Sequence, residues 1–306
     1  MSGTGRPPEL EGEGRSAAAL LLLATFAWGL SFAVVKQALA SSTPLAFTAL
    51  RFAIAALLLA PFAGWKVGVT HSELGAGALL GGLLAAGFAT QTIGLVYTTP
   101  ARSAFLVASS SILAPLLAAL TGRERAGPRL LVALGVAGLG IYYLTAPEAG
   151  RMNRGDLWTL GTAVSFAAQI VVVARLSRRY APARLVWLEI MATALGVAGA
   201  VLLFETPHVR WGAGFALMLG YAALPATALA LWWQLVAQRR LSATTAALIL
   251  CLEPVFAALA SWVWLGERLS VRQWVGGAFI LAGMGIAATR GGSASPTASD
   301  PRIEAS

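Results

Sequence analysis

The sequence is poor in charge, cysteine and histidine. Charged residues occupy 11% of its 306 positions, against about 25% in a soluble domain. Cys251 is the only cysteine, which excludes an intrachain disulfide. The two histidines, His71 and His208, lie far apart and have no cysteine or histidine at metal-ligand spacing. We therefore expect no metal site.

Motifs for binding nucleotides and nucleic acids are also absent. Neither GxGxxG nor GxxxxGK occurs, so there is no glycine-rich loop to hold a phosphate, and we expect no cofactor. The formal net charge is +9, but the arginines lie mostly in short loops and form no contiguous basic stripe. Nucleic acid is therefore not an expected partner, and nothing indicates an obligatory protein partner.

Long apolar segments are what the sequence does contain, since 58% of its residues are hydrophobic. A membrane-spanning helix needs about 20 mostly apolar residues. The first run, 17–35, has 19 residues without a charge, which is too long for a signal peptide, so we expect a retained span. Segments that reach or nearly reach spanning length number ten: 17–38, 44–63, 74–96, 101–121, 129–146, 157–177, 184–204, 211–237, 243–265 and 271–289.

The distribution of lysine and arginine predicts the orientation in the lipid bilayer. With the N-terminus inside, 14 of the 22 basic residues fall on the cytoplasmic side, and Lys36 and Arg51 lie within apolar segments. Cytoplasmic loops carry the excess of basic residues. We therefore expect a multi-pass protein of the cell (inner) membrane with both termini cytoplasmic. The six outer residues are Arg102, Arg151, Arg154, Arg210, Arg268 and Arg272.

Prolines that recur about 140 residues apart indicate an internal duplication. Pro44 aligns with Pro182 at an offset of 138 residues, and Pro115 with Pro254 at 139. Each half holds five spans, and an odd number forces the halves to cross in opposite directions. We predict an all-α integral membrane protein whose ten transmembrane helices form two inverted five-helix repeats around a central cavity. The parts are a tail (1–16), a first repeat (17–146), a loop (147–156), a second repeat (157–289) and a disordered tail (290–306).

Three stretches resemble the EamA-type family of the drug/metabolite transporter superfamily. They are Trp28-Gly29-x-Ser31-Phe32 with Lys36, Arg51-Phe52, and LEPVFAALASWVWLGERLSVRQWVGGAFILAGMGI at 252–286, which is the most specific. The resemblance covers roughly 17–145 and 155–289. It implies ten spans, inverted halves and a central cavity, in carriers of which many export amino acids and related metabolites. The first half departs from the pattern, because Ala114 replaces the second half's Glu253, so the halves are not chemically equivalent.

Glu253 is the candidate for the central chemistry. It lies about ten residues into the ninth segment, which at a rise of 1.5 Å per residue is about 15 Å deep. A carboxylate at that depth costs roughly 2.5–3.5 kcal/mol to insert. It is interpreted either as a proton-coupling group or as an anchor for a substrate amine. A structural role, accepting hydrogen bonds from a neighbouring broken helix or staying protonated, is the alternative.

Polar and aromatic residues predicted at mid-span outline the rest of a candidate site. An amide without partners in lipid costs several kcal/mol, so such side chains should face protein or a cavity. Each aromatic could instead serve packing or face lipid. The lining suits a small apolar or aromatic molecule with a polar end. The predicted substrate-binding residues are Trp28, Ser31, Phe32, Gln91, Ser110, Gln169, Tyr221, Trp232 and Glu253.

Three further charges lie within apolar segments. Arg51 and Glu189 occupy equivalent repeat positions. They could form an ion pair, each reach its own interface, or serve helix packing. Lys36, near the outer end of the first segment, is expected to snorkel or to offer a vestibule charge to anionic groups.

Small residues recur at four-residue spacing in two segments. Gly77 and Gly81 form one such pair, and Ala192, Gly196 and Ala200 form a second set. Small-xxx-small faces let helix backbones approach closely, so we expect these residues to serve helix packing.

These features predict a secondary transporter, not an enzyme, that exposes a central site alternately by rocking its two halves. Its partners are a small-molecule substrate, the bilayer and a proton as candidate coupling ion. From the resemblance, the first substrate class is amino acids, aromatic or apolar, moved outward. The alternatives are transport of another solute class (a drug or nucleotide sugar), a channel, or a membrane enzyme acting on lipid-linked substrates. A channel would need charge rings or a carbonyl filter, and an enzyme a metal motif or a His/Asp/Ser constellation.

Overall fold

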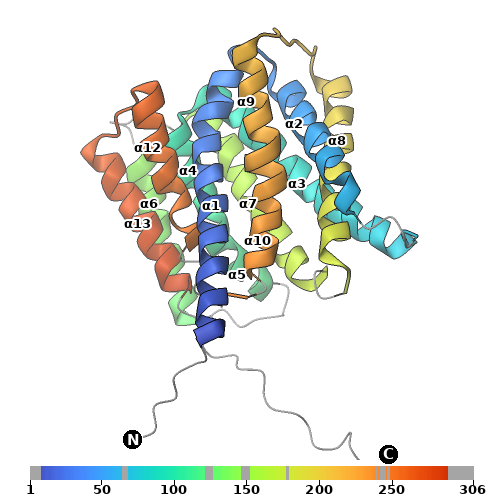
Figure 1. Cartoon of the computed structure of the whole chain (residues 1–306). Coiled ribbons are helices and arrows are strands. Elements are labelled where there is room, and N and C mark those ends of the chain that lie inside the picture. Colours follow the sequence, from blue (N-terminus) through green and yellow to red (C-terminus); the bar gives the residue numbers. More distant parts are fainter. Residues whose placement is uncertain are drawn as a thin grey trace, which may run out of the picture.

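The described chain folds into a bundle of helices (Figure 1). The computed structural model describes residues 8–63, 68–120, 127–145, 152–176, 179–238, 240–241, 246 and 249–288. The predicted tail 290–306 and residues 147–151 of the predicted loop 147–156 lie outside these residues. The helices are α1 (Pro8–Ala38), α2 (Pro44–Leu59), η1 (Ala60–Phe62), α3 (His71–Tyr97), α4 (Pro100–Ala108), α5 (Ser110–Leu120), α6 (Pro128–Thr145), α7 (Arg154–Leu176), α8 (Pro182–Phe204), α9 (Ala213–Ala223), η3 (Leu224–Leu229), α10 (Ala230–Gln238), α12 (Glu253–Leu265) and α13 (Val271–Ala288).

Proline and glycine set several helix boundaries. The helices α2, α4, α6 and α8 begin at Pro44, Pro100, Pro128 and Pro182. The fixed φ of proline suits the first helical turn, where its missing N–H is no loss. The helix α12 ends at Gly266, whose φ of 64° is left-handed and therefore favours glycine.

The helices account for the ten predicted membrane crossings. Seven segments of the described chain are long and apolar enough to span a bilayer: α1, α2 with η1, α3, α4 with α5, α7, α8, and α9 through α10. The apolar stretches Pro128–Leu144 of α6 and Glu253–Leu265 of α12 are shorter. Together with α13 they complete the count.

Two predicted spans are not single unbroken helices. The segment 101–121 is divided at Ser109, between α4 and α5. In the segment 243–265, a turn at 251–252 precedes α12, which has only 13 residues. Glu253 is therefore the first residue of α12 and directly follows a break in the span. Proline at the next position lacks the N–H that a continuing helix would use.

The two halves run in opposite directions, as contacts at the two ends of the bundle show. The end of α1 meets the end of α3, where Lys36 Nζ lies 3.1 Å from the Thr98 carbonyl oxygen. Thr98 in turn donates a hydrogen bond to Asp156 at the start of α7. At the opposite end, Arg184 near the start of α8 pairs with Glu73 near the start of α3. Because α7 begins where α1 ends, these equivalent helices are antiparallel.

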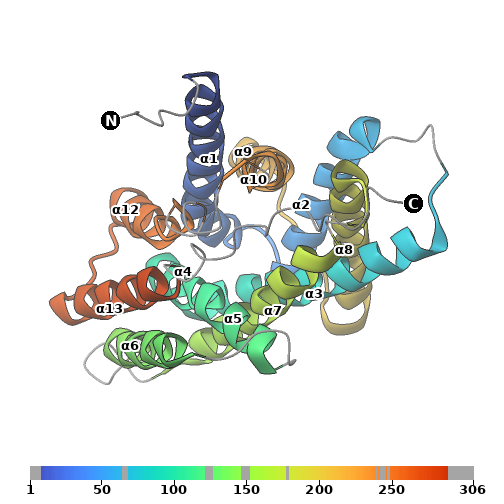
Figure 2. The same cartoon turned by 90° about the horizontal axis from the view of Figure 1, so that it is seen from below.

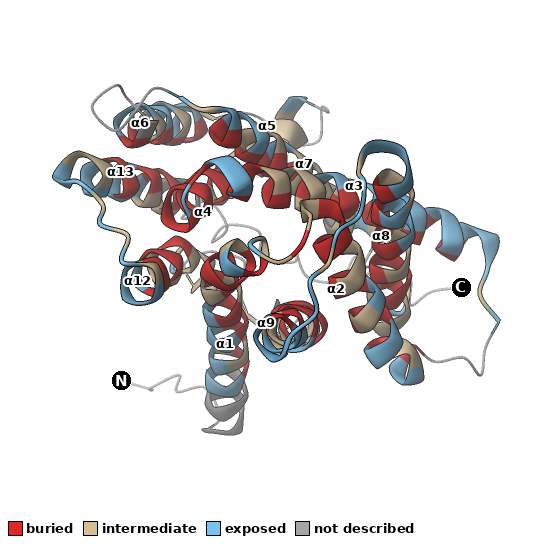
Figure 3. Ribbon diagram, turned by 90° about the horizontal axis from the view of Figure 1, so that it is seen from above, coloured by how far each residue is buried: buried red, intermediate tan, exposed pale blue. Residues whose placement is uncertain are grey.

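The main helix packing joins one half to the other. The closest neighbours include α6 with α13, α3 with α7 and α8, α2 with α8, and α1 with α12 (Figure 2). In Figure 3 the buried helix faces turn toward one another and the exposed faces turn outward. The predicted small residues let α3 and α8 approach closely, since a Cβ on Gly77 would lie 2.5 Å from the Leu188 Cβ. The small-residue faces of α3 and α8 therefore pack on each other.

Candidate functional site

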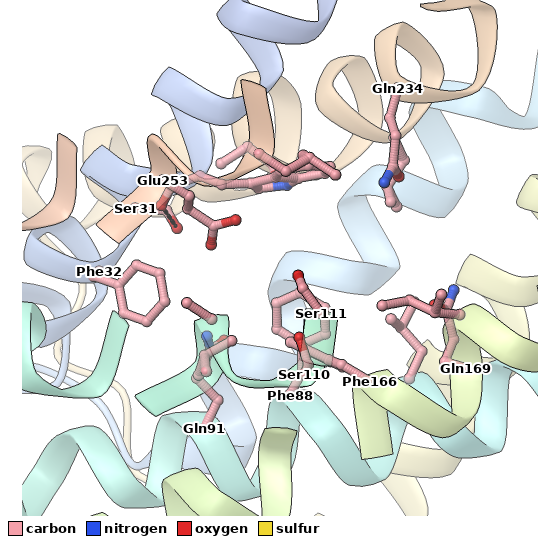
Figure 4. A pocket seen from close by; sticks show the side chains of 18 of the residues that line it. Ser31, Phe32, Phe88, Gln91, Ser110, Ser111, Phe166, Gln169, Gln234 and Glu253 are labelled. Carbon is pink, nitrogen blue, oxygen red and sulfur yellow. Dashed lines mark hydrogen bonds between the residues drawn. The ribbon is translucent and has the colours of Figure 1, made fainter. Parts of the chain in front are cut away.

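A cavity lies between the two halves, near the middle of the bundle (Figure 4). Its volume is about 150 Å³. Since one water needs about 10–15 Å³ of such space, a solute with on the order of ten non-hydrogen atoms fits. Each half contributes ten lining residues: Trp28, Ser31, Phe32, Leu84, Phe88, Gln91, Val107, Ala108, Ser110 and Ser111 from the first, and Phe166, Gln169, Ile170, Ala226, Thr227, Leu231, Gln234, Leu250, Glu253 and Met284 from the second.

Aromatic rings form much of the wall. Trp28 and Phe32 lie on α1, Phe88 on α3 and Phe166 on α7. The rings of Phe88 and Phe166 contact each other, with centroids 5.2 Å apart. This wall offers flat apolar surface to a solute.

Five polar lining side chains have no hydrogen-bond partner among the described residues. Figure 4 shows Glu253 pointing into the cavity opposite Ser110 and Ser111, with Gln91 and Gln234 on other sides. Glu253 is the only acidic residue among the described residues of the lining, and none of those residues is basic. The lining therefore carries one carboxylate, without a basic partner, and several groups able to donate hydrogen bonds.

Other polar lining groups are already used within the protein. The Trp28 indole N–H donates to the Ala226 carbonyl oxygen at 3.0 Å, and the Ser31 hydroxyl donates to the Trp28 carbonyl oxygen at 2.7 Å. The Gln169 amide nitrogen donates to Glu189 Oε1 at 2.7 Å. These bonds hold the wall in place and leave the Gln169 amide oxygen for the cavity.

A packed apolar cluster separates the cavity from the end of the bundle where α1 ends. Phe32 and Val107 line the cavity and also belong to this cluster, which continues through Phe47, Leu95 and Phe215. Beyond it, the loop after α1 and the loop after α8 are joined by an isolated antiparallel bridge between Ser42 and Val209. The cavity is therefore closed on this side by parts of both halves.

Arg51 and Glu189 neither pair with each other nor reach an interface, so the expected ion pair and the expected interface positions are wrong. Both are buried, at 3% and 5% exposure. Arg51 donates to Thr227 and to the Ala226 carbonyl, whereas Glu189 accepts from Gln169. Each charge lies behind the cavity wall and is hydrogen-bonded to a residue that lines it.

Lys36 is bound at a helix end. Its Nζ lies 2.5 Å from the Leu95 carbonyl oxygen, 3.2 Å from that of Val96 and 3.1 Å from that of Thr98. Carbonyl groups at the end of a helix lack partners within the helix. A lysine side chain can donate hydrogen bonds to them. Lys36 thus caps α3.

Seven of the nine predicted site residues line the cavity, and two do not. Trp28, Ser31, Phe32, Gln91, Ser110, Gln169 and Glu253 are brought together around it. Tyr221 instead donates its hydroxyl to the Ala27 carbonyl oxygen at 2.9 Å, and Trp232 lies half-buried on α10 outside the lining.

The sequence predictions missed lining residues that helical spacing could have found. Phe88 and Phe166 each lie three residues before a predicted amide, Gln91 or Gln169, and therefore on the same helix face. Thr227 and Gln234 follow a change of helix type in η3, which spacing could not have shown. No group of three or more His, Cys, Asp or Glu side chains able to hold a metal occurs in the described part of the chain.

Comparisons with known proteins agree on one family. The EamA-like transporter family matches residues 15–146 and again residues 153–289. An uncharacterised transporter of Archaeoglobus fulgidus is 32% identical over 271 residues, covering 88% of this chain and 85% of that protein. An uncharacterised transporter of Synechocystis is 27% identical over 291 residues, covering 85% and 86%.

A solved structure shows the same fold. This crystal structure of a protein aligns with a TM-score of 0.61 at 22% identity and covers 90% of this chain and 98% of its own. The double match across both halves and the spanning helices, taken together, show that the chain is a multi-pass membrane protein and belongs to the EamA-like transporter family.

Proposed function

We propose that the protein is a secondary transporter that exports small organic solutes having an ammonium group and an apolar or aromatic body. Amino acids are the first expected class. The observation that carries this proposal is the charge of the cavity lining, whose described residues include one carboxylate, Glu253, and no basic residue. A carboxylate at membrane depth without a partner is costly, and a solute ammonium group would supply that partner.

The rest of the lining suits such a solute. The rings of Trp28, Phe32, Phe88 and Phe166 offer flat surface to its apolar body. For an amino acid, the carboxylate of the solute would accept hydrogen bonds from the hydroxyl groups opposite Glu253 and from the amide groups on the other sides of the cavity. A nucleotide sugar fits this lining less well, because phosphates favour arginine or lysine.

The closed end of the cavity supports alternating access. Parts of both halves close the end where α1 stops, so release there requires the halves to move apart. Inverted repeats that rock against each other provide this motion. We propose that the closed end faces outward and that both termini are cytoplasmic, in the cell (inner) membrane. A proton on Glu253 in the absence of solute would couple export to proton entry.

Three solutes that differ by one group test the proposal. Counterflow into proteoliposomes is measured for phenylalanine, for phenethylamine, which lacks the carboxylate, and for phenylpropanoate, which lacks the ammonium group. We expect saturable counterflow of the first two and none of the third.

Variants link the result to Glu253. Glu253→Gln should abolish counterflow of both ammonium solutes. Glu205→Gln is the matched control, because Glu205 accepts bonds from the first N–H groups of α2 and lies outside the cavity. Transport of phenylpropanoate alone, or unchanged transport by Glu253→Gln, would contradict the proposal.

A further inference from the structure

Arg51 is placed directly behind the cavity wall. It is 3% exposed, and its Cζ lies 4.8 Å from the centroid of the Phe88 ring, which lines the cavity. A buried guanidinium against an aromatic face gains a cation–π interaction. Arg51 itself is not part of the lining.

The guanidinium reaches from the first half of the protein into the second. Its Nε donates to Thr227 Oγ1 at 2.6 Å, and its Nη2 donates to the Ala226 carbonyl oxygen at 3.0 Å. That carbonyl oxygen also accepts from the Trp28 indole N–H at 3.0 Å. Ala226, Thr227 and Trp28 all line the cavity. One side chain thus contacts three lining residues, Phe88, Ala226 and Thr227, and shares the Ala226 carbonyl with Trp28.

The segment that Arg51 contacts is a π-helix, η3, with Pro225 near its start. A π-helix departs from the regular hydrogen-bond ladder, and proline removes one N–H from it. Thr227 uses its hydroxyl hydrogen on the Ala222 carbonyl oxygen, so its oxygen is available to Arg51. Donors from other helices therefore help to hold this part of the wall in its observed shape.

We propose that Arg51 is a positioning residue for solute recognition, which holds the π-helical wall of the second half against the first half. Through the Ala226 carbonyl and the Phe88 ring it sets the distance between Thr227, Trp28 and Phe88 across the cavity. It touches no solute. The proposal rests on the transport function proposed above, because its effect is on solute binding.

The test combines transport kinetics with hydrogen–deuterium exchange on the full-length protein. Arg51→Lys keeps the charge without the forked geometry. Thr227→Val removes the hydroxyl, which accepts from Arg51 and donates to the Ala222 carbonyl oxygen, and Thr227→Ser restores it. Arg184→Gln is the control, because Arg184 pairs with Glu73 at an end of the bundle. Exchange is followed in peptides covering 224–231, and KM for phenylalanine is measured by counterflow.

We expect Arg51→Lys and Thr227→Val to speed exchange in 224–231 and to raise KM about tenfold, with a smaller change in maximal rate. The loss of a hydrogen bond to a buried charged group weakens binding by about that factor. Thr227→Ser should restore the exchange rate of 224–231, and Arg184→Gln should match the unmodified protein in both measurements. Unchanged exchange in both folded variants would overturn the proposal, as would faster exchange with unchanged KM. If the unmodified protein transports none of the three solutes, the proposed function is wrong. The exchange rates of 224–231 would still test whether Arg51 stabilises η3.

Discussion

The amide nitrogen of Gln169 lies 2.7 Å from Oε1 of Glu189, directly behind the cavity. An ionised carboxylate only accepts hydrogen bonds, so this contact leaves the amide oxygen of Gln169 for the solute. Gln169 and Glu253 therefore present acceptors from two sides of the same space (Figure 4). A solute with hydrogen-bond donors matches both.

A double-mutant cycle on this pair should show strong coupling. Gln169→Leu leaves the buried Glu189 without its partner, and we expect a loss of about 1–3 kcal/mol in the free energy of unfolding. Adding Glu189→Leu removes the charge as well and should recover most of that loss, because replacing both partners by apolar groups is nearly neutral. Thermal unfolding of the single and double variants in detergent measures this. Additive effects would show that the bond does not matter.

Two adjacent glycines on α3 should respond differently to alanine. A Cβ on Gly81 would lie 2.7 Å from the Glu189 carbonyl oxygen and would overlap Ala192, whereas a Cβ on Gly82 would meet nothing within 4 Å. Gly81→Ala should therefore destabilise the protein by about 1–3 kcal/mol. Gly82→Ala should stay within about 1 kcal/mol of the unmodified protein. Equal melting temperatures for the two variants would contradict the close approach of α3 and α8.

Removing the lysine that caps α3 should also lower stability. Lys36→Met deprives the carbonyl groups of Leu95, Val96 and Thr98 of a donor, and we expect a loss of about 1–3 kcal/mol. Gln37→Met is the control, because Gln37 is next to Lys36 in the sequence and its own side chain is exposed. The comparison uses the melting temperatures of the two variants. If Lys36 only extended to the membrane surface, both would melt alike.

The spans and their inversion could be predicted from sequence because both follow from simple regularities. Apolar length marks each crossing, and Pro44 and Pro182 fix the register of the duplication. The break before α12 could not be placed, because periodicity does not show where a helix restarts. Glu253 lies at the start of a helix, whereas the sequence predicted only its depth in the ninth segment.

The predicted site residues and the cavity lining differ around the point where the helix changes type. Tyr221 and Trp232 are eleven residues apart, a spacing that puts both on one face of a regular α-helix. The π-helix η3 lies between them, and its wider turn rotates the residues that follow. Leu231 and Gln234 consequently line the cavity, and Trp232 does not. The Ala226 carbonyl oxygen in η3 accepts hydrogen bonds from Trp28 and Arg51 of the other half, and no local sequence signal shows such contacts.

The opposite orientation of the halves is the central claim, and one labelling experiment tests it most directly. Gln37 and Arg175 are equivalent repeat positions, 138 residues apart, and both are exposed near the end of their helix. Each is changed singly to cysteine in a Cys251→Ala background and treated in intact cells with a membrane-impermeant thiol reagent. We predict labelling at position 37 in intact cells and at position 175 only in inverted vesicles. Labelling of both positions from the same side would contradict the inverted arrangement and the carrier mechanism built on it.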